Sequence, residues 1–303
     1  MGVILVTLNF LGALFMEDVQ KKKFWLVRLW NYFTTYEKIW LFSICSLGVL
    51  FALLFPEDDG ALTWLKIVEL IVIVGGCSCE LLLSKQSKWA FIVSFVLYDL
   101  TQIIVYTFNG YYISALFEIV FWVPMLFISF HLWGKWQDKE NGELTAVKEI
   151  NFKRDIAIFL GVLAVSVSVG LLFLFIDELA LKFSDAISSV VTAIIPGATA
   201  YESGLSSYWY LDALANTFSV CNGLFLVLRF KEQWIPWIGV ALVEAVMWIL
   251  SGQYIMLILS LGYLMNSTYG FIMWQKYIKT HPESQSKQVE MDNKILNNDA
   301  NHN

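Results

Sequence analysis

Long apolar runs recur along this chain of 303 residues, and they constrain its fold more than any other feature. An α-helix needs roughly 20 mainly apolar residues to cross a bilayer, and the runs have roughly that length. Hydrophobic residues make up 58% of the sequence and charged residues only 15%, whereas soluble domains carry about 25% charged residues. The fold class is therefore an all-α polytopic membrane protein. This excludes a nucleic-acid-binding protein, a coiled coil, a disulfide scaffold and a disordered chain.

Eight of the runs are predicted to cross the membrane as helices. Their bounds are 39–55, 62–83, 89–108, 111–133, 155–176, 208–228, 234–251 and 253–275. The predicted domains are an N-terminal interfacial segment (1–38), an extra helix (39–55), a first set of three helices (62–133), a cytoplasmic loop with a linker helix (134–177), an extracellular segment (178–207), a second set of three helices (208–275) and a disordered cytoplasmic tail (276–303).

The distribution of basic residues predicts the orientation of these helices. Of the 20 Lys and Arg residues, all but Lys66 and Lys182 fall in the two terminal segments or in alternate connections. Connections rich in Lys and Arg stay on the cytoplasmic side. With eight spans, both ends of the chain are then cytoplasmic. The net charge of −6 does not indicate a soluble partner, because much of the acid lies within the apolar runs or in one short turn, 56–60.

The two sets of three helices resemble each other in the order of their features. The first set runs from Lys88-Trp89 through Gly110-Tyr111-Tyr112 to Trp133. The second set runs from Gln233-Trp234 through Gly252-Gln253-Tyr254 to Trp274. One helix separates the sets, so both would run in the same direction. Parallel repeats of this kind build transporters whose substrate site lies between the repeats near the midplane of the membrane.

Carboxylates inside the apolar runs are the strongest candidates for a site. A carboxylate at the centre of a bilayer costs ~2.5–3.5 kcal/mol on insertion scales, so each requires a reason. Apart from Asp155, the first residue of the run 155–176, they all fall in the two sets of three helices: Glu69, Glu80, Asp99, Glu118, Asp212 and Glu244. We therefore expect the two sets to enclose a hydrated cavity.

Helical spacing joins these acids to aromatic and amide side chains. Glu244 shares a helix face with Trp234 and Trp237, Glu118 shares one with Trp122, and Asp212 shares one with Asn216. Tryptophan faces stack on a flat ring and attract a cation, while amides and carboxylates bind its polar edges. The predicted substrate-binding residues are Trp234, Trp237, Glu244, Glu118, Trp122, Asp99, Asn216 and Asp212.

Several of the same residue types have a structural alternative. Tryptophans at the ends of spans, Trp234 among them, are typical of the belts that anchor helices at the membrane surface. His131 lies near a span end and is interpreted as an interfacial residue. The four cysteines (Cys45, Cys77, Cys79 and Cys221) lie within apolar runs and are interpreted as buried thiols, not as metal ligands. No metal or cofactor is expected.

The second set of helices also carries a recognisable pattern. Its elements are Asp212-Ala213-Leu214, Arg229, Trp234-x-x-Trp237, Gly252-Gln253-Tyr254, Gly270 and Trp274. The first set agrees in Gly110-Tyr111-Tyr112, Pro124-Met125 and Trp133. Together, over residues 62–276, they resemble the PnuC family of bacterial vitamin transporters.

The resemblance implies a core of three, one and three helices related to the SWEET transporters, arranged as a homotrimer in the bacterial inner or plasma membrane. It also implies facilitated diffusion of nicotinamide riboside, which a cytoplasmic kinase of NAD biosynthesis traps by phosphorylation. The family's Trp-x-x-Trp pair matches Trp234 and Trp237, but its following Asn or Asp is Ala241 here. Glu118 stands where the family commonly has Asn, and Leu126 where it has Gln. Thiamine, riboflavin and deoxynucleosides remain open as substrates.

The expected mechanism is alternating access, with the two sets of helices moving around a central site. No phosphate-binding G-x-x-x-x-G-K-[ST] loop occurs, so the chain does not hydrolyse nucleotides itself. A membrane subunit that binds substrate for a separate ATPase is one alternative. An intramembrane enzyme is another, but the sequence contains no H-E-x-x-H or G-x-S-x-G signature.

Overall fold

A computed structural model of the protein describes residues 31–54, 64–108, 111–135, 147–195, 197, 209–252 and 254–282. The chain divides into two compact units, residues 1–43 and residues 44–303. Within the described residues, eight helices are long and apolar enough to cross a membrane. Each overlaps one predicted span, so the number and order of the predicted spans agree with the structure. The described part contains no β-strand, only an isolated bridge between Lys148 and Phe230.

The described part of the first unit contains the start of helix α2 (Thr35–Leu54). The backbone N–H of Glu37 donates to Oγ1 of Thr34 at 3.3 Å, and the backbone N–H of Thr34 donates to Oε2 of Glu37 at 2.7 Å. This reciprocal arrangement is a capping box, which satisfies two backbone donors that the first helical turn leaves free. The helix therefore begins four residues before the predicted span at 39.

The second unit contains the remaining helices, and two of its membrane spans are divided by a wider π-helical turn. The first divided span consists of α4 (Trp89–Val93), η1 (Ser94–Asp99) and α5 (Leu100–Phe108). The second consists of α6 (Tyr112–Phe117), η2 (Glu118–Trp122) and α7 (Val123–Lys135). The other elements are α3 (Trp64–Ser84), α8 (Phe152–Lys182), α9 (Ser184–Ile194), α10 (Trp209–Val227), the short 3-10 turn η3 (Lys231–Gln233), α11 (Trp234–Ser251) and α12 (Tyr254–Thr280).

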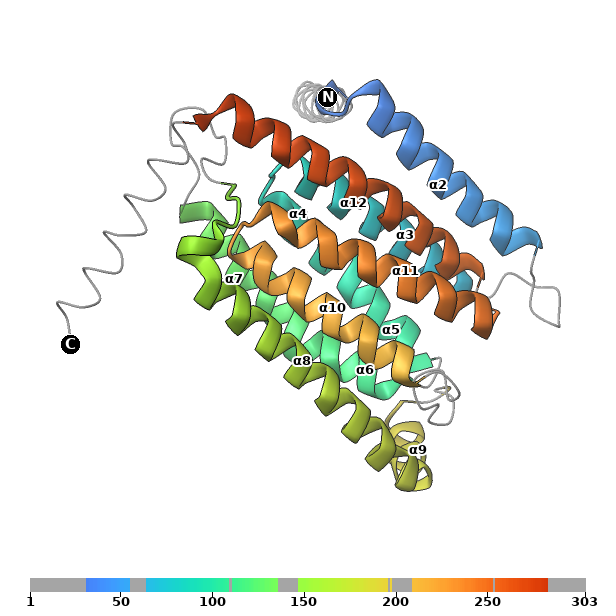
Figure 1. Ribbon diagram of the computed structural model, residues 1–303. Helices are drawn as coiled ribbons and strands as arrows, with labels where there is room; N and C mark the ends of the chain where they lie inside the picture. The colour runs from blue at the N-terminus through green and yellow to red at the C-terminus, as the bar shows by residue number, and fades with distance from the viewer. Residues whose placement is uncertain are drawn as a thin grey trace, which may run out of the picture. The chain divides into compact units, whose positions relative to one another are not determined.

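Six of these spans pack in a closed ring. Helices α10, α11, α12 and α3 are neighbours in that order, and the two divided spans connect α3 back to α10 (Figure 1). Helix α8 packs against α10 on the outside of the ring. The six spans of the ring come from residues 64–135 and 209–280, and α8 lies between them in the chain.

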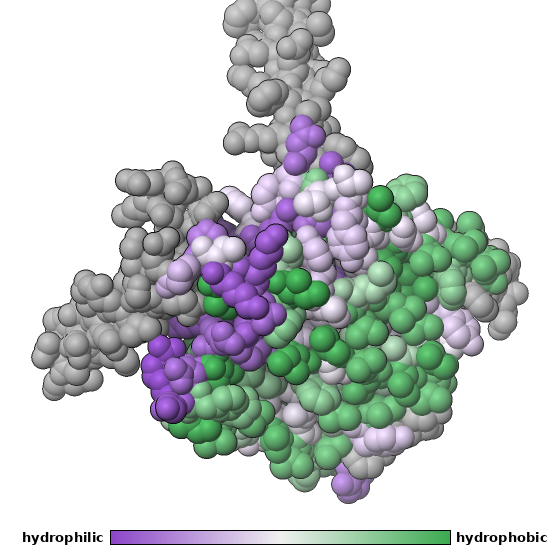
Figure 2. Space-filling model, turned by 45° about the horizontal axis from the view of Figure 1, so that its top comes forward, coloured by the Kyte–Doolittle hydropathy of each residue, from purple (hydrophilic) through white to green (hydrophobic). Residues whose placement is uncertain are grey.

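The outer faces of the helices are apolar. Only 22–56% of the most hydrophobic window of each span is buried within the protein. Apolar side chains cover a broad area of the surface, and hydrophilic residues gather towards one end (Figure 2). Contact of such a surface with lipid is favourable, whereas its contact with water is not.

The connections at one end of the ring are rich in lysine and arginine, and we call this the basic end; it includes the turns after α3 and α10 and the segment 147–150. This segment is fixed to the turn after α10. The N–H of Lys148 donates to the carbonyl of Arg229 at 2.8 Å, and the N–H of Lys231 donates to the carbonyl of Lys148 at 2.8 Å. An ion pair between Lys231 and Glu149 strengthens the attachment.

Two helices extend beyond their predicted ends. Helix α8 continues to Lys182 and is followed by α9, so part of the predicted outer segment 178–207 is helical. Helix α12 continues to Thr280, so the first five residues of the predicted tail 276–303 are helical. Lys279 in the last turn favours this end, because basic residues interact well with the negative pole of a helix. Residues 283–303 and 1–30 lie outside the described residues.

Candidate functional site

A cavity of about 100 Å³, lined by both polar and apolar side chains, lies inside the ring of six spans. Residues of α3, both divided spans, α10, α11 and α12 contribute to its lining. It extends from Tyr111 and Asp212, near the start of α6 and α10, to Leu83 and Leu226, near the basic end. The cavity thus occupies much of the length of the ring, where a transported molecule would cross the membrane.

Five carboxylates line this cavity, one from each of five elements: Glu80 (α3), Asp99 (η1), Glu118 (η2), Asp212 (α10) and Glu244 (α11). Among the described residues that line it there is no lysine, arginine or histidine. Charges held away from water are costly unless an opposite charge or hydrogen bonds compensate them. The cavity is therefore suited to a positively charged or proton-donating solute.

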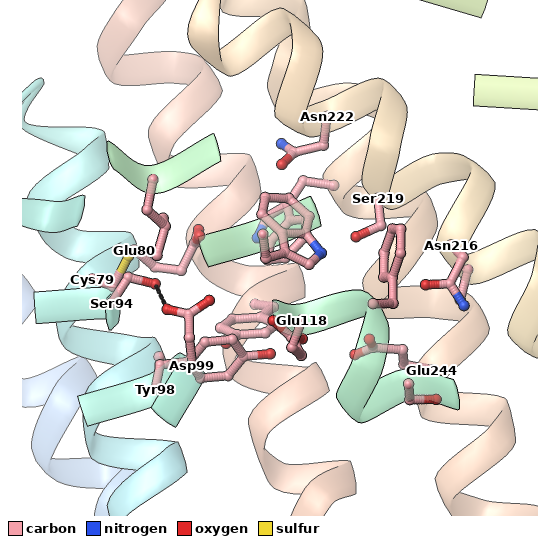
Figure 3. Close-up of a pocket in the computed structure, with 18 of the residues that line it drawn as sticks. Cys79, Glu80, Ser94, Tyr98, Asp99, Glu118, Asn216, Ser219, Asn222 and Glu244 are labelled. Atoms are coloured by element: carbon pink, nitrogen blue, oxygen red, sulfur yellow. Dashed lines mark hydrogen bonds between the residues drawn. The ribbon is translucent and has the colours of Figure 1, made fainter. Parts of the chain in front are cut away.

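Small neutral side chains donate hydrogen bonds to the acids of the cavity. Ser94 Oγ donates to Asp99 Oδ2 at 2.8 Å, and Figure 3 shows these two side chains together beside Glu80. Asn266 Nδ2 donates to Glu80 Oε2 at 3.3 Å. Ser260 Oγ donates to Glu244 Oε2 at 3.2 Å. These bonds orient the carboxylates without neutralising them.

Glu118 lies at the centre of the cavity in Figure 3. Its side chain is buried, and within the described part of the chain its Oε2 atom has no hydrogen-bond partner. A buried acceptor without a donor is rare in folded proteins and calls for an explanation. The carboxyl group of the neighbouring Asp99 interacts with Glu118, and a donor group on a bound molecule would satisfy the remaining Oε2 atom.

The two wide turns set the position of Asp99 and Glu118. Asp99 is the last residue of η1, and Glu118 is the first residue of η2. In η1 the N–H of Leu100 donates to the carbonyl of Phe95, and in η2 the N–H of Val123 donates to the carbonyl of Glu118. Each bond spans five residues in place of four, which is the pattern of a π-bulge and is frequent at functional sites.

Local residues explain why the helices widen there. Pro124 follows η2 and has no N–H, and its ring clashes with the carbonyl four residues earlier in a regular helix. Near η1, the hydroxyl of Thr101 donates to the carbonyls of Leu97 (2.7 Å) and Tyr98 (2.9 Å). Gly75 of α3 accommodates the widened backbone, because a Cβ atom at position 75 would overlap the carbonyl group of Leu97.

Aromatic rings form part of the cavity wall. Trp237 and Tyr263 lie with ring centroids 5.1 Å apart and planes tilted by 42°. Tyr98 meets Tyr263 edge-on at 6.2 Å. On another side, Trp122 packs over Gly223, where an added Cβ would lie 3.2 Å from the indole. The wall therefore offers flat apolar surface beside the carboxylates.

Helix α10 supplies a row of neutral polar groups. Asn216, Ser219 and Asn222 follow one side of the helix in Figure 3. Asn216 Nδ2 donates to Oδ1 of Asp212 at 3.2 Å, one turn earlier. Asn222 Nδ2 donates to the backbone carbonyl of Gln233 at 3.0 Å, which connects α10 to the start of α11.

The structure brings seven of the eight predicted binding residues to the cavity: Asp99, Glu118, Trp122, Asp212, Asn216, Trp237 and Glu244. Trp234 is not among the residues that line it. This indole is 1% exposed and meets Trp274 edge-on, with ring centroids 5.6 Å apart. It is three residues before Trp237, so its side chain points about 60° away around the helix.

The sequence prediction left out Glu80, Tyr98, Tyr263 and Asn222, which also line the cavity. Glu80 lies near the end of its predicted span, where a side chain can reach water. In the structure Glu80 is buried, and its partner Asn266 is 186 positions away in the chain. A stripe of Gly76, Cys79, Glu80 and Leu83 on one face of α3 is the signal that could have found it.

Comparisons with known proteins agree with this architecture. A family model described as nicotinamide mononucleotide transporter matches residues 66–276. A nicotinamide riboside transporter PnuC from Neisseria mucosa is 25% identical over 267 residues, which cover 85% of this chain and 87% of that protein. A nicotinamide riboside transporter PnuC from Haemophilus influenzae is 36% identical over 69 residues, which cover 23% of this chain and 30% of that protein.

A solved structure shares the fold. The crystal structure of the vitamin B3 transporter PnuC aligns with a TM-score of 0.55 at 20% identity, over 82% of this chain and 94% of that one. The predicted all-α membrane fold and the resemblance to the PnuC family are confirmed. The prediction of a transporter and not an enzyme is confirmed as well, because the relatives are named as transporters. The chain belongs to the nicotinamide mononucleotide transporter family of membrane proteins.

Proposed function

We propose that this protein carries nicotinamide riboside, or a closely related unphosphorylated vitamin, across the bacterial cell membrane. The observation that carries the proposal is a cavity lined by five carboxylates and aromatic rings, with no basic side chain among the described residues of its lining. Nicotinamide riboside has a flat pyridinium ring with a positive charge. Such a ring gains about 0.5–2 kcal/mol from the face of an aromatic side chain.

The charge of the cavity also favours nicotinamide riboside over its phosphorylated form, nicotinamide mononucleotide. The relatives are named for the riboside and the family for the mononucleotide, and these two compounds differ by one phosphate. Proteins bind phosphate through arginine, lysine or helix N-termini. A phosphate among Glu80, Asp99, Glu118 and Glu244 would be repelled, so the riboside is the better substrate.

In this proposal the residues divide into two groups. Trp237 and Trp122 stack on the ring, and the acceptors Glu118, Glu244 and Asn216 bind polar or cationic groups, with Asp99 and Asp212 adding negative charge. Transport is facilitated diffusion by alternating access, in which the two sets of three helices move as parallel repeats. A cytoplasmic kinase of NAD biosynthesis then traps the substrate by phosphorylation.

We also propose an orientation in the membrane and an oligomeric state. The basic end faces the cytoplasm of the inner or plasma membrane, in keeping with the excess of lysine and arginine in its connections. Both termini are then cytoplasmic. A homotrimer is proposed from the family resemblance.

Uptake by the purified protein in liposomes tests the substrate. The panel consists of nicotinamide riboside, nicotinamide mononucleotide, thiamine, riboflavin and a deoxynucleoside, with no ATP present. We expect saturable uptake of the riboside that stops when the concentrations inside and outside are equal, and no uptake of the mononucleotide. Binding without transport would indicate a subunit that depends on an ATPase. Transport of thiamine or a deoxynucleoside in place of the riboside would overturn the assignment.

A further inference from the structure

Two turns at the basic end have the same backbone geometry. The turn after α3 contains Gln86 (φ 59°), and the turn after α10 contains Arg229 (φ 62°). The N–H of each left-handed residue donates to the carbonyl three residues earlier, which belongs to Leu83 (2.8 Å) or Leu226 (3.0 Å). The next N–H in each turn donates to the carbonyl five residues earlier. Both helices thus end in the same left-handed capping motif.

Each of these turns is bound by a tryptophan from the other set of helices. Trp274, near the end of α12, donates from Nε1 to the carbonyl of Leu83 at 3.0 Å. Trp133, near the end of α7, donates from Nε1 to the carbonyl of Leu226 at 3.2 Å. In both cases the acceptor is the carbonyl that also receives the left-handed residue's N–H. We call Trp133, Trp274 and their two acceptors, Leu83 and Leu226, the tryptophan clasp.

Aromatic packing closes the space around the clasp. Trp133 and Trp274 lie with ring centroids 5.9 Å apart. Phe91 meets Trp133 edge-on at 4.9 Å, and Trp234 meets Trp274 edge-on at 5.6 Å. None of these four side chains is more than 1% exposed. Phe91 thus contacts Trp133 in the first set of helices as Trp234 contacts Trp274 in the second. In the sequence pattern Trp89 corresponds to Trp234, but in the structure Trp89 is 58% exposed.

The clasp lies directly at the inner end of the cavity. Leu83 and Leu226, whose carbonyls accept the indole bonds, line the cavity, as does Phe91. A solute that left the cavity past Leu83 and Leu226 would meet the two turns and the two buried tryptophans. The indole–carbonyl bonds hold the two rings in place there.

We propose that the tryptophan clasp is the gate of the transport pathway at the basic end, closed in this structure and opened by release of the two indole–carbonyl bonds. This inference rests on the proposed transport function but not on the identity of the substrate. The two bonds join the first set of helices to the second in both directions. Opening therefore separates the sets at this end, and closing restores both bonds together. Trp234 acts as a positioning residue that holds Trp274.

Cys79 provides a native reporter for the gate, because it is a free cysteine that lines the cavity. Replacement of Cys45, Cys77 and Cys221 by alanine leaves Cys79 as the only thiol. The rate at which a membrane-impermeant, cationic methanethiosulfonate modifies Cys79 is then measured from each side, in inside-out vesicles and in intact cells. With both tryptophans present, a closed gate predicts slower modification from the basic end than from the opposite side.

Replacement of the tryptophans tests the clasp itself. Trp133→Phe and Trp274→Phe keep a ring but remove the N–H donor. Loss of one such bond should raise the rate of modification from the basic end about fivefold, and the double variant should show a larger increase. Trp89→Phe, at the same end but half-exposed, is the matched control and should leave the rate unchanged.

The outcomes distinguish a failure of the gate proposal from a failure of the substrate proposal. The gate proposal is wrong if the rate of Cys79 modification from the basic end is unchanged in both single variants and in the double variant. It is also wrong if, with both tryptophans present, Cys79 is modified faster from the basic end than from the opposite side. The second comparison needs no tryptophan variant, so it remains decisive if a replacement prevents folding. Protection of Cys79 by nicotinamide riboside reports on the substrate alone. A lack of protection with intact gate behaviour would reject the riboside and leave the gate standing.

Discussion

The indole of Trp237 and the phenol ring of Tyr263 face each other across the contact between α11 and α12, with ring centroids 5.1 Å apart and planes tilted by 42°. Both residues line the cavity. Because the planes are tilted, the two rings form a corner of apolar surface next to Glu80. A flat cationic ring in this corner would contact an aromatic face while it remains close to a carboxylate.

Replacement of Trp237 tests the stacking surface. We expect Trp237→Ala to raise the dissociation constant for nicotinamide riboside about tenfold, because a cation–π contact contributes on the order of 1–2 kcal/mol in a dry site. Trp237→Phe should have a smaller effect. Titration calorimetry on the purified protein measures both. Trp64→Ala is the control, since Trp64 is 53% exposed and lies outside the cavity lining. Equal affinities for the wild type and Trp237→Ala would contradict the assignment.

Glu244→Gln removes one negative charge and leaves an oxygen that can still accept the hydrogen bond from Ser260. We expect the affinity for the cationic riboside to fall about tenfold, because opposite charges a few ångströms apart attract strongly at low dielectric. The affinity for its neutral dihydropyridine form should change little. Glu178→Gln is the matched control, because Glu178 is exposed and pairs with Lys182 on α8. If both forms of the riboside lose the same affinity, Glu244 does not act through its charge.

The hydroxyl of Thr101 is expected to stabilise the wide turn η1. Thr101→Val keeps the shape of the side chain but removes its bonds to the carbonyls of Leu97 and Tyr98. A net loss of about 1 kcal/mol should lower the apparent melting temperature in detergent by about 2 °C. Thr101→Ser keeps the hydroxyl and should melt close to the wild type. A valine variant as stable as the serine variant would show that the bonds contribute nothing measurable.

Gly75→Ala should be the most disruptive small substitution in α3. The added Cβ would overlap backbone atoms of Leu97, which cannot rotate away as a side chain can. Overpacking of this kind costs about 1–3 kcal/mol, and it should also displace Asp99. Gly161→Ala in α8 is the control, because its Cβ would meet nothing within 4 Å. The melting temperature and the binding affinity should fall for position 75 only. A stable Gly75→Ala variant with normal binding would contradict this account of η1.

The eight spans could be predicted from sequence because a single property, apolar length, determines whether a helix can cross a bilayer. The carboxylates could be found for the same reason, since Asp99, Glu118 and Glu244 stand out against apolar neighbours. Helical spacing predicted which residues share a face of a helix, but not which of those residues line the cavity. Trp234 and Trp237 share one stripe, yet only Trp237 lines the cavity, whereas Trp234 packs against Trp274.

Contacts between distant parts of the chain were not predictable. The bond between Asn266 and Glu80 joins residues 186 positions apart, and the bond between Trp274 and Leu83 joins residues 191 apart. Each depends on the packing of whole helices, which local spacing does not determine. The wide turn η2 had a partial signal in Pro124, but η1 contains neither proline nor glycine.

The wide turns have a consequence for how the chain tolerates changes in length. Each holds one surplus residue relative to a regular helix. Deletion of one residue between 94 and 99 would restore ordinary winding and leave the later side chains facing as before, because the bulge has already taken up the ~100° rotation of one residue. Tyr106 and Ser94 would then both still face the lumen. The same deletion within α5 has no surplus residue to remove, so it would turn the side chains that follow it by ~100°.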